Sequence, residues 1–331
     1  MTTQFKSLLQ VLDFFKEEET CKNYLATKRW GETPCCPHCG NTKVWKTNRG
    51  FTCAAKQCGQ KFTVTTGTIF ENTKLPLRLW FATIYICTAH KKGISSLQLG
   101  RDLNITQKTA WFLLHRVREM LANNAPEMLE NNVEIDETYV GGKNANRHAN
   151  KKKEGTQGRS ANDKTPVLGI AQKQITEIKV RDHKVIPGKI VKEKIIIQAS
   201  KVSCTVVKDT TAETIVPIML NQVTANSKVV TDAYRAYSSL AQNFQHVAIK
   251  HTEGNYITIG DDHTNTIEGF WSLLKRGIIG IYHQVSPKHL HRYCNEFTFR
   301  YNSRLVKDVV RFEDCFSQVN NVRLTYKNLI A

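Results

Sequence analysis

Apolar residues in the first 125 positions recur mostly at helical spacing, which predicts a largely α-helical front part of the chain. Residues 5–15 place their apolar side chains on one face and predict an amphipathic helix within residues 1–20. The run from Pro76 to His90 is apolar nearly all round, so we expect a buried helix that starts at the proline and ends before Gly93.

Residues 94–121 predict two short helices joined by a tight turn at Asn104, with Thr106 as the N-cap of the second helix. That second helix has an apolar stripe and an opposite face that is polar and basic, made of Gln107, Lys108, Trp111, His115, Arg116 and Arg118. Insertion into the major groove of DNA requires such a helix after such a turn. Residues 73–125 are therefore predicted to form a helix-turn-helix DNA-binding domain, with an ordinary helical bundle as the alternative.

Beyond residue 130 short strands alternate with separate helices, which predicts a mixed α/β domain. Residues 174–200 make the connection to the next predicted strand longer than we expect for this domain. This segment predicts an added hairpin of unknown purpose. In the segment 143–164, seven of 22 residues are Lys or Arg and none is a large apolar residue. This segment is expected to be a mobile basic loop, either clamping a DNA backbone or forming a solvated hairpin tip.

The charge of the chain narrows the class of partner. Its 331 residues include 47 Lys and Arg against 29 Asp and Glu, a formal net charge of +18. Such an excess favours a polyanion, with double-stranded DNA first and an anionic membrane surface second. No stretch reaches the ~20 apolar residues needed to span a bilayer, so no membrane is expected.

Ten cysteines are present, and six of them precede residue 60. Cys36 and Cys39 form a C-x2-C pair, and Cys53 and Cys58 form a C-x4-C pair. Four thiolates on two such knuckles match the tetrahedral shell of one structural Zn2+, which predicts a zinc ribbon over residues 21–72, with Cys35 as an alternative to Cys36. The clustering argues against a secreted disulfide framework and indicates a reduced, intracellular protein.

Three acidic residues carry the candidate chemistry. Asp136 and Asp232 lie at or near the ends of predicted strands, and Glu268 lies on a predicted helix whose same face carries Asn265 and Lys275. Converging carboxylates can hold two Mg2+ or Mn2+ ions, which activate a water or a 3′-hydroxyl for in-line displacement at phosphorus. A single acidic residue at such a position does not predict a metal site. The prediction depends on all three acids occurring together.

From about residue 20 to 305 the chain resembles insertion-sequence transposases with an N-terminal zinc ribbon and a catalytic core of the DDE-plus-lysine type, the group related to the Merlin elements. The matching segments are CPHCG, GTIFENTKLPLRLWF, DETYVGGK, TDAYRAY, HTNTIEGFWSLLKRG and HLHRYCNEFTFRYN. The resemblance implies a ribonuclease H-like core over residues 130–310, followed by a C-terminal tail, 311–331. It also implies Asp136, Asp232 and Glu268 as the metal-binding triad, with Lys275 after it and Asn265 as the alternative third ligand.

The function implied is a DNA transposase that binds the terminal repeats of its element, nicks DNA and joins the freed 3′-hydroxyl to target DNA. Two ends joined in one event imply at least a homodimer when active. The alternatives are a DNA-binding regulator derived from such an enzyme and a ribonuclease H-like nuclease. We expect the protein to lie in the bacterial cytoplasm with the nucleoid, or in the nucleus of a eukaryote.

Overall fold

The computed structural model describes residues 5–122, 128–142, 148–152, 164–182, 186, 190–249 and 262–331. The chain divides into two compact units: unit 1 comprises Met1–Asn124 with Ser303–Ala331, and unit 2 comprises Ala125–Asn302. Most of the basic segment predicted at 143–164 lies outside the described residues. No helix in the described part of the chain has the length and apolar character needed to cross a membrane.

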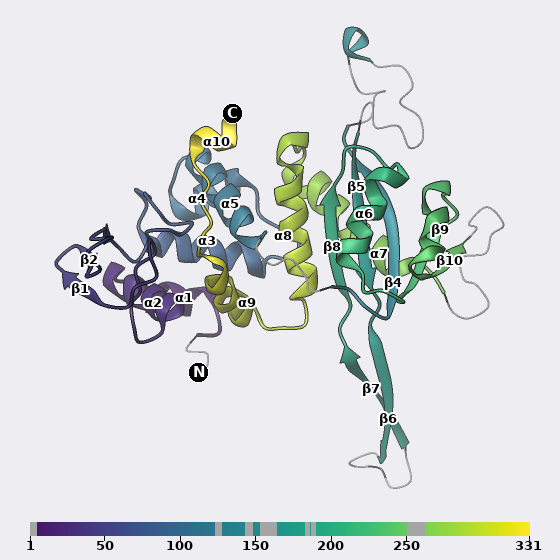
Figure 1. Ribbon diagram of the computed structural model, residues 1–331, viewed down its shortest axis with the longest axis horizontal. Helices are drawn as coiled ribbons and strands as arrows, with labels where there is room; N and C mark the ends of the chain where they lie inside the picture. The colour runs from purple at the N-terminus through teal and green to yellow at the C-terminus, as the bar shows by residue number, and fades with distance from the viewer. Residues whose placement is uncertain are drawn as a thin grey trace. The chain divides into compact units, whose positions relative to one another are not determined.

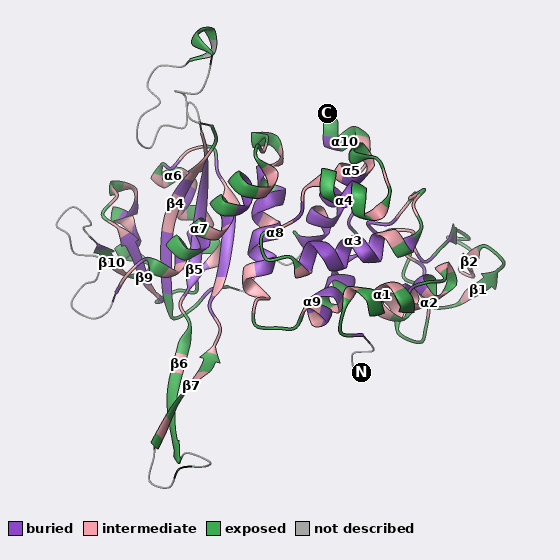
Figure 2. Cartoon of the chain, turned by 180° about the vertical axis from the view of Figure 1, so that it is seen from behind, coloured by how far each residue is buried: buried purple, intermediate pink, exposed green. Residues whose placement is uncertain are grey.

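Helices dominate unit 1 (Figure 1). Their bounds are α1 Leu8–Phe14, α2 Glu18–Trp30, α3 Leu77–Ala89, α4 Ser96–Leu103, α5 Gln107–Leu121, α9 Asp308–Cys315, the 3-10 helix η7 Phe316–Gln318, and α10 Tyr326–Ile330. Helix α3 is buried along most of its length, as its apolar sequence predicts, and it packs against α1, α5 and α9 (Figure 2). Helix α9 brings Phe312 onto the ring of Phe81, so the last part of the chain completes the core of the first.

The cysteine-containing stretch of unit 1 folds as a small antiparallel sheet. Its described strands are β1 Val44–Thr47, β2 Gly50–Cys53 and β3 Lys61–Phe62, in the order β1-β2-β3. Phe51 and Phe62 stack across this sheet, and Trp30 at the end of α2 packs edge-on against both rings. This aromatic cluster is small, so the ribbon has little apolar area of its own to stabilise it.

Unit 2 is built on a mixed sheet whose described strands run in the order β10-β9-β4-β5-β8. Their bounds are β4 Asn132–Val140, β5 Thr165–Gln172, β8 Lys201–Val206, β9 Lys228–Asp232 and β10 Gln245–Ile249. Strands β4, β9 and β10 are parallel to one another, whereas β5 pairs antiparallel with both β4 and β8. The mixed α/β class predicted for this part of the chain is confirmed.

Helices cover both faces of this sheet. Helix α6 (Ala212–Gln222) and the 3-10 helix η3 (Arg235–Gln242) pack on one face, and α7 (Asn265–Gly277) and α8 (Leu290–Asn302) pack on the other. Shorter described helical segments are η2 Ala149–Lys151, the π-helix η5 Ile278–Tyr282 and η6 Pro287–His289. Alternation along β4 sends Val133 and Ile135 into the α6 face. The even-numbered residues of β4 therefore point toward α7, which places Asp136 beneath that helix.

The added hairpin expected at residues 174–200 is confirmed. Strands β6 (Ile175–Asp182) and β7 (Ile190–Gln198) pair antiparallel as a separate two-stranded sheet that extends away from the five-strand sheet (Figures 1 and 2). Ile178, Val180 and Ile190 are each exposed by about three-fifths. The hairpin thus adds an arm to unit 2 without adding to its core.

Candidate active site and metal centre

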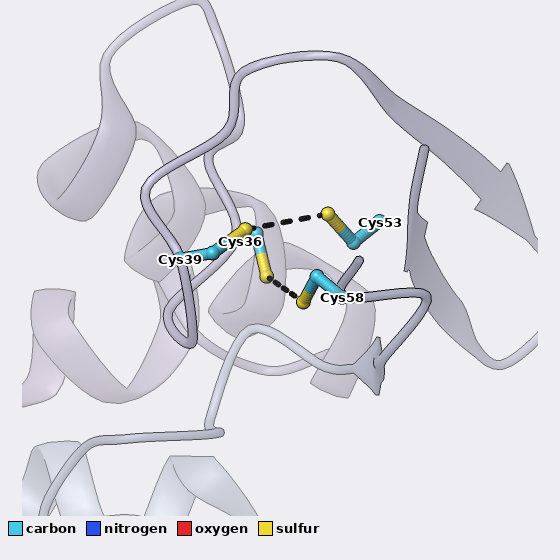
Figure 3. A group of neighbouring side chains, drawn as sticks. All are labelled: Cys36, Cys39, Cys53 and Cys58. Atoms are coloured by element: carbon cyan, nitrogen blue, oxygen red, sulfur yellow. Dashed lines mark hydrogen bonds between the residues drawn. The ribbon is translucent and has the colours of Figure 1, made fainter. Parts of the chain in front are cut away.

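Four cysteine side chains meet at one end of the ribbon sheet. The Sγ atoms of Cys36, Cys39, Cys53 and Cys58 all lie within 4.8 Å of one another (Figure 3). Gly40 and Gly59 follow the two knuckles with positive φ angles of 75° and 55°, and their N–H groups close the turns. Four soft thiolates at this separation fit a structural Zn2+. Of the two adjacent candidates, the cluster contains Cys36 and not Cys35.

Helices α4 and α5 follow one another through the tight turn that the pattern predicts. Asn104 ends α4 in the left-handed conformation, with φ 52°, and Thr106 caps α5 by accepting the N–H of Thr109. Gly100 allows the turn to approach α4, because a Cβ there would lie 3.0 Å from the carbonyl oxygen of Ile105. Gln107 and Lys108, at the start of α5, are exposed, and Trp111 is half-buried.

The second half of the predicted basic face of α5 is not on the surface, and that part of the prediction is wrong. His115, Arg116 and Arg118 are exposed by only 0%, 6% and 1%. The guanidinium of Arg116 donates to the carbonyl oxygens of Ile69 and Glu71 and lies over the ring of Trp80. These side chains are held inside unit 1 and cannot reach a DNA groove in this structure.

Asp136 and Asp232 are brought level on neighbouring strands of unit 2. The parallel β4–β9 ladder pairs Ile135 with Thr231, so the next residue on each strand is one of the two aspartates. Asp232 is the last residue of β9, where its Oδ1 atom accepts the N–H of Tyr234, 3.1 Å away. The two carboxylates thus lie at the same height on the sheet.

Helix α7 brings Glu268 and Lys275 to the pocket that Asp136 lines. Both line one pocket with Asp136, Glu137, Thr138, Trp271 and Ser272. The Nε1–H of Trp271 donates to Oδ2 of Asp136 at 2.9 Å, and Oε1 of Glu268 accepts from Oγ1 of Thr264 at 2.8 Å. Asn265 is exposed at the first position of α7 and does not line this pocket.

The electrostatics of the pocket are those of an acidic site. Burial raises the pKa of Asp136, and the negative charges of Asp232 and Glu268 raise it further, against the opposing hydrogen bond from Trp271. No Lys or Arg in the described residues forms an ion pair with Asp136 or Glu268. Carboxylate oxygens with this excess of negative charge fit a hard divalent cation. As the structure stands, however, only the cysteine group among the described residues brings three or more ligand atoms together closely enough for one ion.

Sequence patterns missed two residues that shape this pocket. Trp271 lies in the buried apolar stripe of α7, and its indole N–H donates a hydrogen bond to Asp136. Glu134 is fully buried on β4 and accepts hydrogen bonds from the backbone N–H groups of Thr266 and Ile267. The sequence does contain one indication of Glu134: it is an acidic residue two positions before Asp136, where strand alternation places its side chain inside the domain.

Comparisons with known proteins show which families the chain matches. Residues 128–302 match the family described as ISXO2-like transposase domain, and residues 16–61 match the family described as transposase zinc-ribbon domain. The chain is 30% identical over 299 residues to an "Uncharacterized protein in transposable element ISH50" of Halobacterium salinarum, covering 86% of this chain and 91% of that protein.

Two further similarities are more limited. An "Uncharacterized transposase-like protein" of Haemophilus influenzae is 28% identical over 111 residues, which cover 33% of this chain and 88% of that protein. A crystal structure of a pre-cleavage Mos1 transpososome aligns over 94% of this chain and 95% of that one, with 11% identity and a TM-score of 0.20.

Proposed function

Since the chain belongs to the family of ISXO2-like transposase domains, we propose that it is a DDE-type DNA transposase that binds the terminal repeats of its element and cuts and joins DNA strands. Unit 2 is the catalytic part in this proposal, and its helix-covered mixed sheet is a ribonuclease H-like core. The zinc ribbon and the α4–α5 pair, taken as a helix-turn-helix, form the DNA-binding part.

The observation that carries the proposal is the level placement of Asp136 and Asp232 on two neighbouring parallel strands. Glu268 lies on the helix that covers this face of the sheet and lines the same pocket as Asp136. Acids from three separate segments of the chain lie close enough for the negative charges of Asp232 and Glu268 to disfavour the charge of Asp136. Such a group is costly unless a cation offsets it, which supports a role in binding Mg2+ or Mn2+.

In the proposed mechanism Asp136, Asp232 and Glu268 are the carboxylates that hold two Mg2+ or Mn2+ ions. When bound, these ions stabilise the charge on the phosphoryl oxygens and lower the pKa of an attacking water. Trp271 keeps one oxygen of Asp136 fixed through its 2.9 Å hydrogen bond. Lys275, exposed on the wall of the pocket, is placed to attract the phosphate of the strand being cut.

The chemistry consists of two displacements at phosphorus. In cleavage, the water oxygen bonds to phosphorus and the P–O3′ bond breaks, so the element strand leaves with a free 3′-hydroxyl. In strand transfer, that hydroxyl attacks a target phosphodiester and the O3′ atom of the target leaves. One phosphodiester bond forms as another breaks, so the second step needs no external energy source.

Recognition of double-stranded DNA is assigned to unit 1. Gln107 and Lys108 are exposed at the first turn of α5, with Trp111 one turn further on, and they are the side chains proposed to enter the major groove. The formal charge of +18 supports contact with phosphates. Because two ends must be joined in one event, we propose that the active form is at least a homodimer.

The test is cleavage of short duplexes that carry the ends of the element, with Mg2+ or Mn2+ present. The wild-type protein should bind these ends and nick them, whereas Asp232→Asn and Glu268→Gln should bind but not cut. Asn265→Ala should still cut if Glu268 is the third ligand. A wild-type protein that binds the ends and never cuts them would indicate a regulator, and equal cutting of unrelated DNA would indicate a general nuclease. Either result would overturn the proposal.

A further inference from the structure

A second carboxylate of β4, Glu134, connects this strand to the beginning of α7. Its Oε2 atom accepts the backbone N–H groups of Thr266 at 2.7 Å and Ile267 at 2.9 Å. Its Oε1 atom accepts the hydroxyl of Thr266 at 2.8 Å. The side chain is completely buried. One carboxylate therefore makes three hydrogen bonds to residues that are 132 and 133 positions away in the sequence.

Helix α7 depends on this contact for its N-terminus. The first N–H groups of any helix lack partners within the helix, and a buried helix end without partners is costly. The local N-cap residue, Thr264, makes no capping hydrogen bond through its side chain. Glu134 takes that role from the sheet, and its negative charge also complements the positive end of the helix dipole.

Two neighbouring groups partly offset the cost of burying this carboxylate. Nζ of Lys173 lies 3.8 Å and Nδ1 of His263 lies 3.3 Å from Oε1 of Glu134. Lys173 directly follows β5, and His263 precedes α7, so the carboxylate connects three segments of unit 2. A buried polar group whose hydrogen bonds are all made holds its neighbours in a single arrangement.

The contact between Glu134 and the start of α7 lies close to the acidic pocket on both elements. Glu134 precedes Asp136 by two residues on the same face of β4, and Thr266 precedes Glu268 by two residues on α7. The hydrogen bond from Trp271 to Asp136 provides a second connection, one turn further along the helix. The strand and the helix are thus fastened together on both sides of Glu268.

We propose that Glu134 is a positioning residue, which sets the distance between Asp136 and Glu268 by fixing the start of α7 on β4. This inference rests on the proposed function, since it assumes that these two carboxylates share metal ions. Glu134 is not a further metal ligand, because both of its oxygens already accept hydrogen bonds and it has no exposed surface. Its role is to hold the ligands, and not to touch the metal ion or the DNA.

The first part of the test measures the helix start itself and needs no DNA. Hydrogen–deuterium exchange at the amides of Thr266 and Ile267 should be slow in the wild-type protein and much faster in Glu134→Ala. Glu134→Gln keeps one carbonyl oxygen but presents an NH2 group toward Lys173, so it should give an intermediate rate. Unchanged slow exchange in both variants would overturn the proposal, whatever the protein does to DNA.

The second part measures the requirement for metal. Loss of a residue that orients metal ligands costs about 10–100-fold in metal affinity or activity. The Mn2+ concentration for half-maximal cleavage should therefore rise at least about tenfold in Glu134→Ala, and less in Glu134→Gln, while binding of the element ends stays unchanged. A wild-type Mn2+ requirement in both variants would also overturn the proposal.

Glu296→Gln is the matched control. Glu296 is likewise a completely buried carboxylate of unit 2, bonded to Arg300 and to the hydroxyl of Tyr282. Its substitution should lower the melting temperature without changing the Mn2+ requirement, which separates positioning from general stability. If wild-type protein fails to cleave with any metal, the proposed function fails, and the exchange experiment still decides whether Glu134 fixes α7.

Discussion

Gly169 lies directly opposite Asp136 in the β4–β5 ladder, and its missing side chain leaves room for the ring that bonds to Asp136. A Cβ atom at position 169 would lie 2.5 Å from the indole of Trp271, much closer than real contacts allow. The glycine therefore serves close approach of a helix to a sheet. Strand β5, helix α7 and strand β4 thus meet at one point, through Gly169, Trp271 and Asp136.

Gly169→Ala should lower cleavage at least about tenfold while the protein still binds element ends. The added methyl group pushes Trp271 away, so Asp136 loses its hydrogen bond and its fixed orientation. Single-turnover cleavage with saturating Mn2+ is the measurement. The control is Gly269→Ala on α7, where a Cβ meets nothing within 4 Å and should add about 0.5–1 kcal/mol of stability. Unimpaired cleavage by Gly169→Ala would show that the Trp271 contact is dispensable.

Asp136→Asn should abolish cleavage and yet stabilise the protein at neutral pH. Burial raises the pKa of Asp136 above its unfolded value of 3.8, so the folded state binds this proton more tightly than the unfolded state. Stability from this group is then present at low pH and is lost as the pH rises through the folded pKa. The amide removes the charge and still offers an oxygen to Trp271.

The measurement is the melting temperature without divalent metal, which should rise by about 2–4 °C per kcal/mol gained. This gain should shrink as the pH is lowered through the raised pKa of Asp136. The exposed Asp13 gives the control, because Asp13→Asn should change neither stability nor cleavage. A less stable Asp136→Asn protein would contradict the acidic character assigned to the pocket.

Zinc should be bound at about one ion per chain and should depend on the four clustered cysteines. Cys36→Ala combined with Cys53→Ala removes one thiolate from each knuckle, which should release the metal and unfold the ribbon. Cys35→Ala should keep its zinc, because Cys35 lies outside the cluster. Elemental analysis of the purified proteins checks both results. Full zinc content in the double variant would mean that the metal is held elsewhere.

Arg116→Ala and Lys108→Ala should separate stability from DNA binding. Arg116 is buried and bonded to backbone carbonyls, so its loss should lower the free energy of unfolding by about 2–3 kcal/mol. Lys108 is exposed, with its Nζ atom 5.1 Å from the ring centre of Tyr326, so its loss should cost the fold at most about 1 kcal/mol. The same substitution should weaken DNA binding and reduce the salt slope by about one. Calorimetry and binding titrations at several salt concentrations test this pair. Wild-type affinity and salt slope in Lys108→Ala would remove the start of α5 from the DNA interface.

Sequence patterns predicted site residues correctly where the interacting residues are close together in the sequence. The two cysteine pairs predicted one four-thiolate group, because each knuckle is only a few residues long and the metal dictates the spacing. Alternation along β4 likewise turns the side chain of Glu137 to the opposite face of the strand from Asp136. Its carboxylate accepts the hydroxyl of Tyr237, in the core on the α6 side of the sheet.

Contacts between distant segments were not predictable from such patterns. The burial of Arg116 depends on the carbonyl groups of Ile69 and Glu71, more than 40 residues earlier, and helical periodicity contains no information about them. Glu134 stands in a strand where an inward acidic residue has no visible partner until α7 is placed over it. In both cases tertiary contacts decide which polar side chains are buried, and a single sequence shows only their spacing.

The return of residues Ser303–Ala331 to unit 1 has a consequence for how the protein is made. Phe312 and Phe316 are completely buried against the ring of Phe81, and the N–H of Ile69 bonds to the carbonyl of Val319. On the ribosome, the N-terminal helices must therefore wait for the entire intervening unit to be translated before their core can close. A product that terminates at residue 302 lacks Phe312 and Phe316, so this core stays open. The part proposed to bind DNA therefore closes its core only after Phe312 and Phe316 have been synthesised.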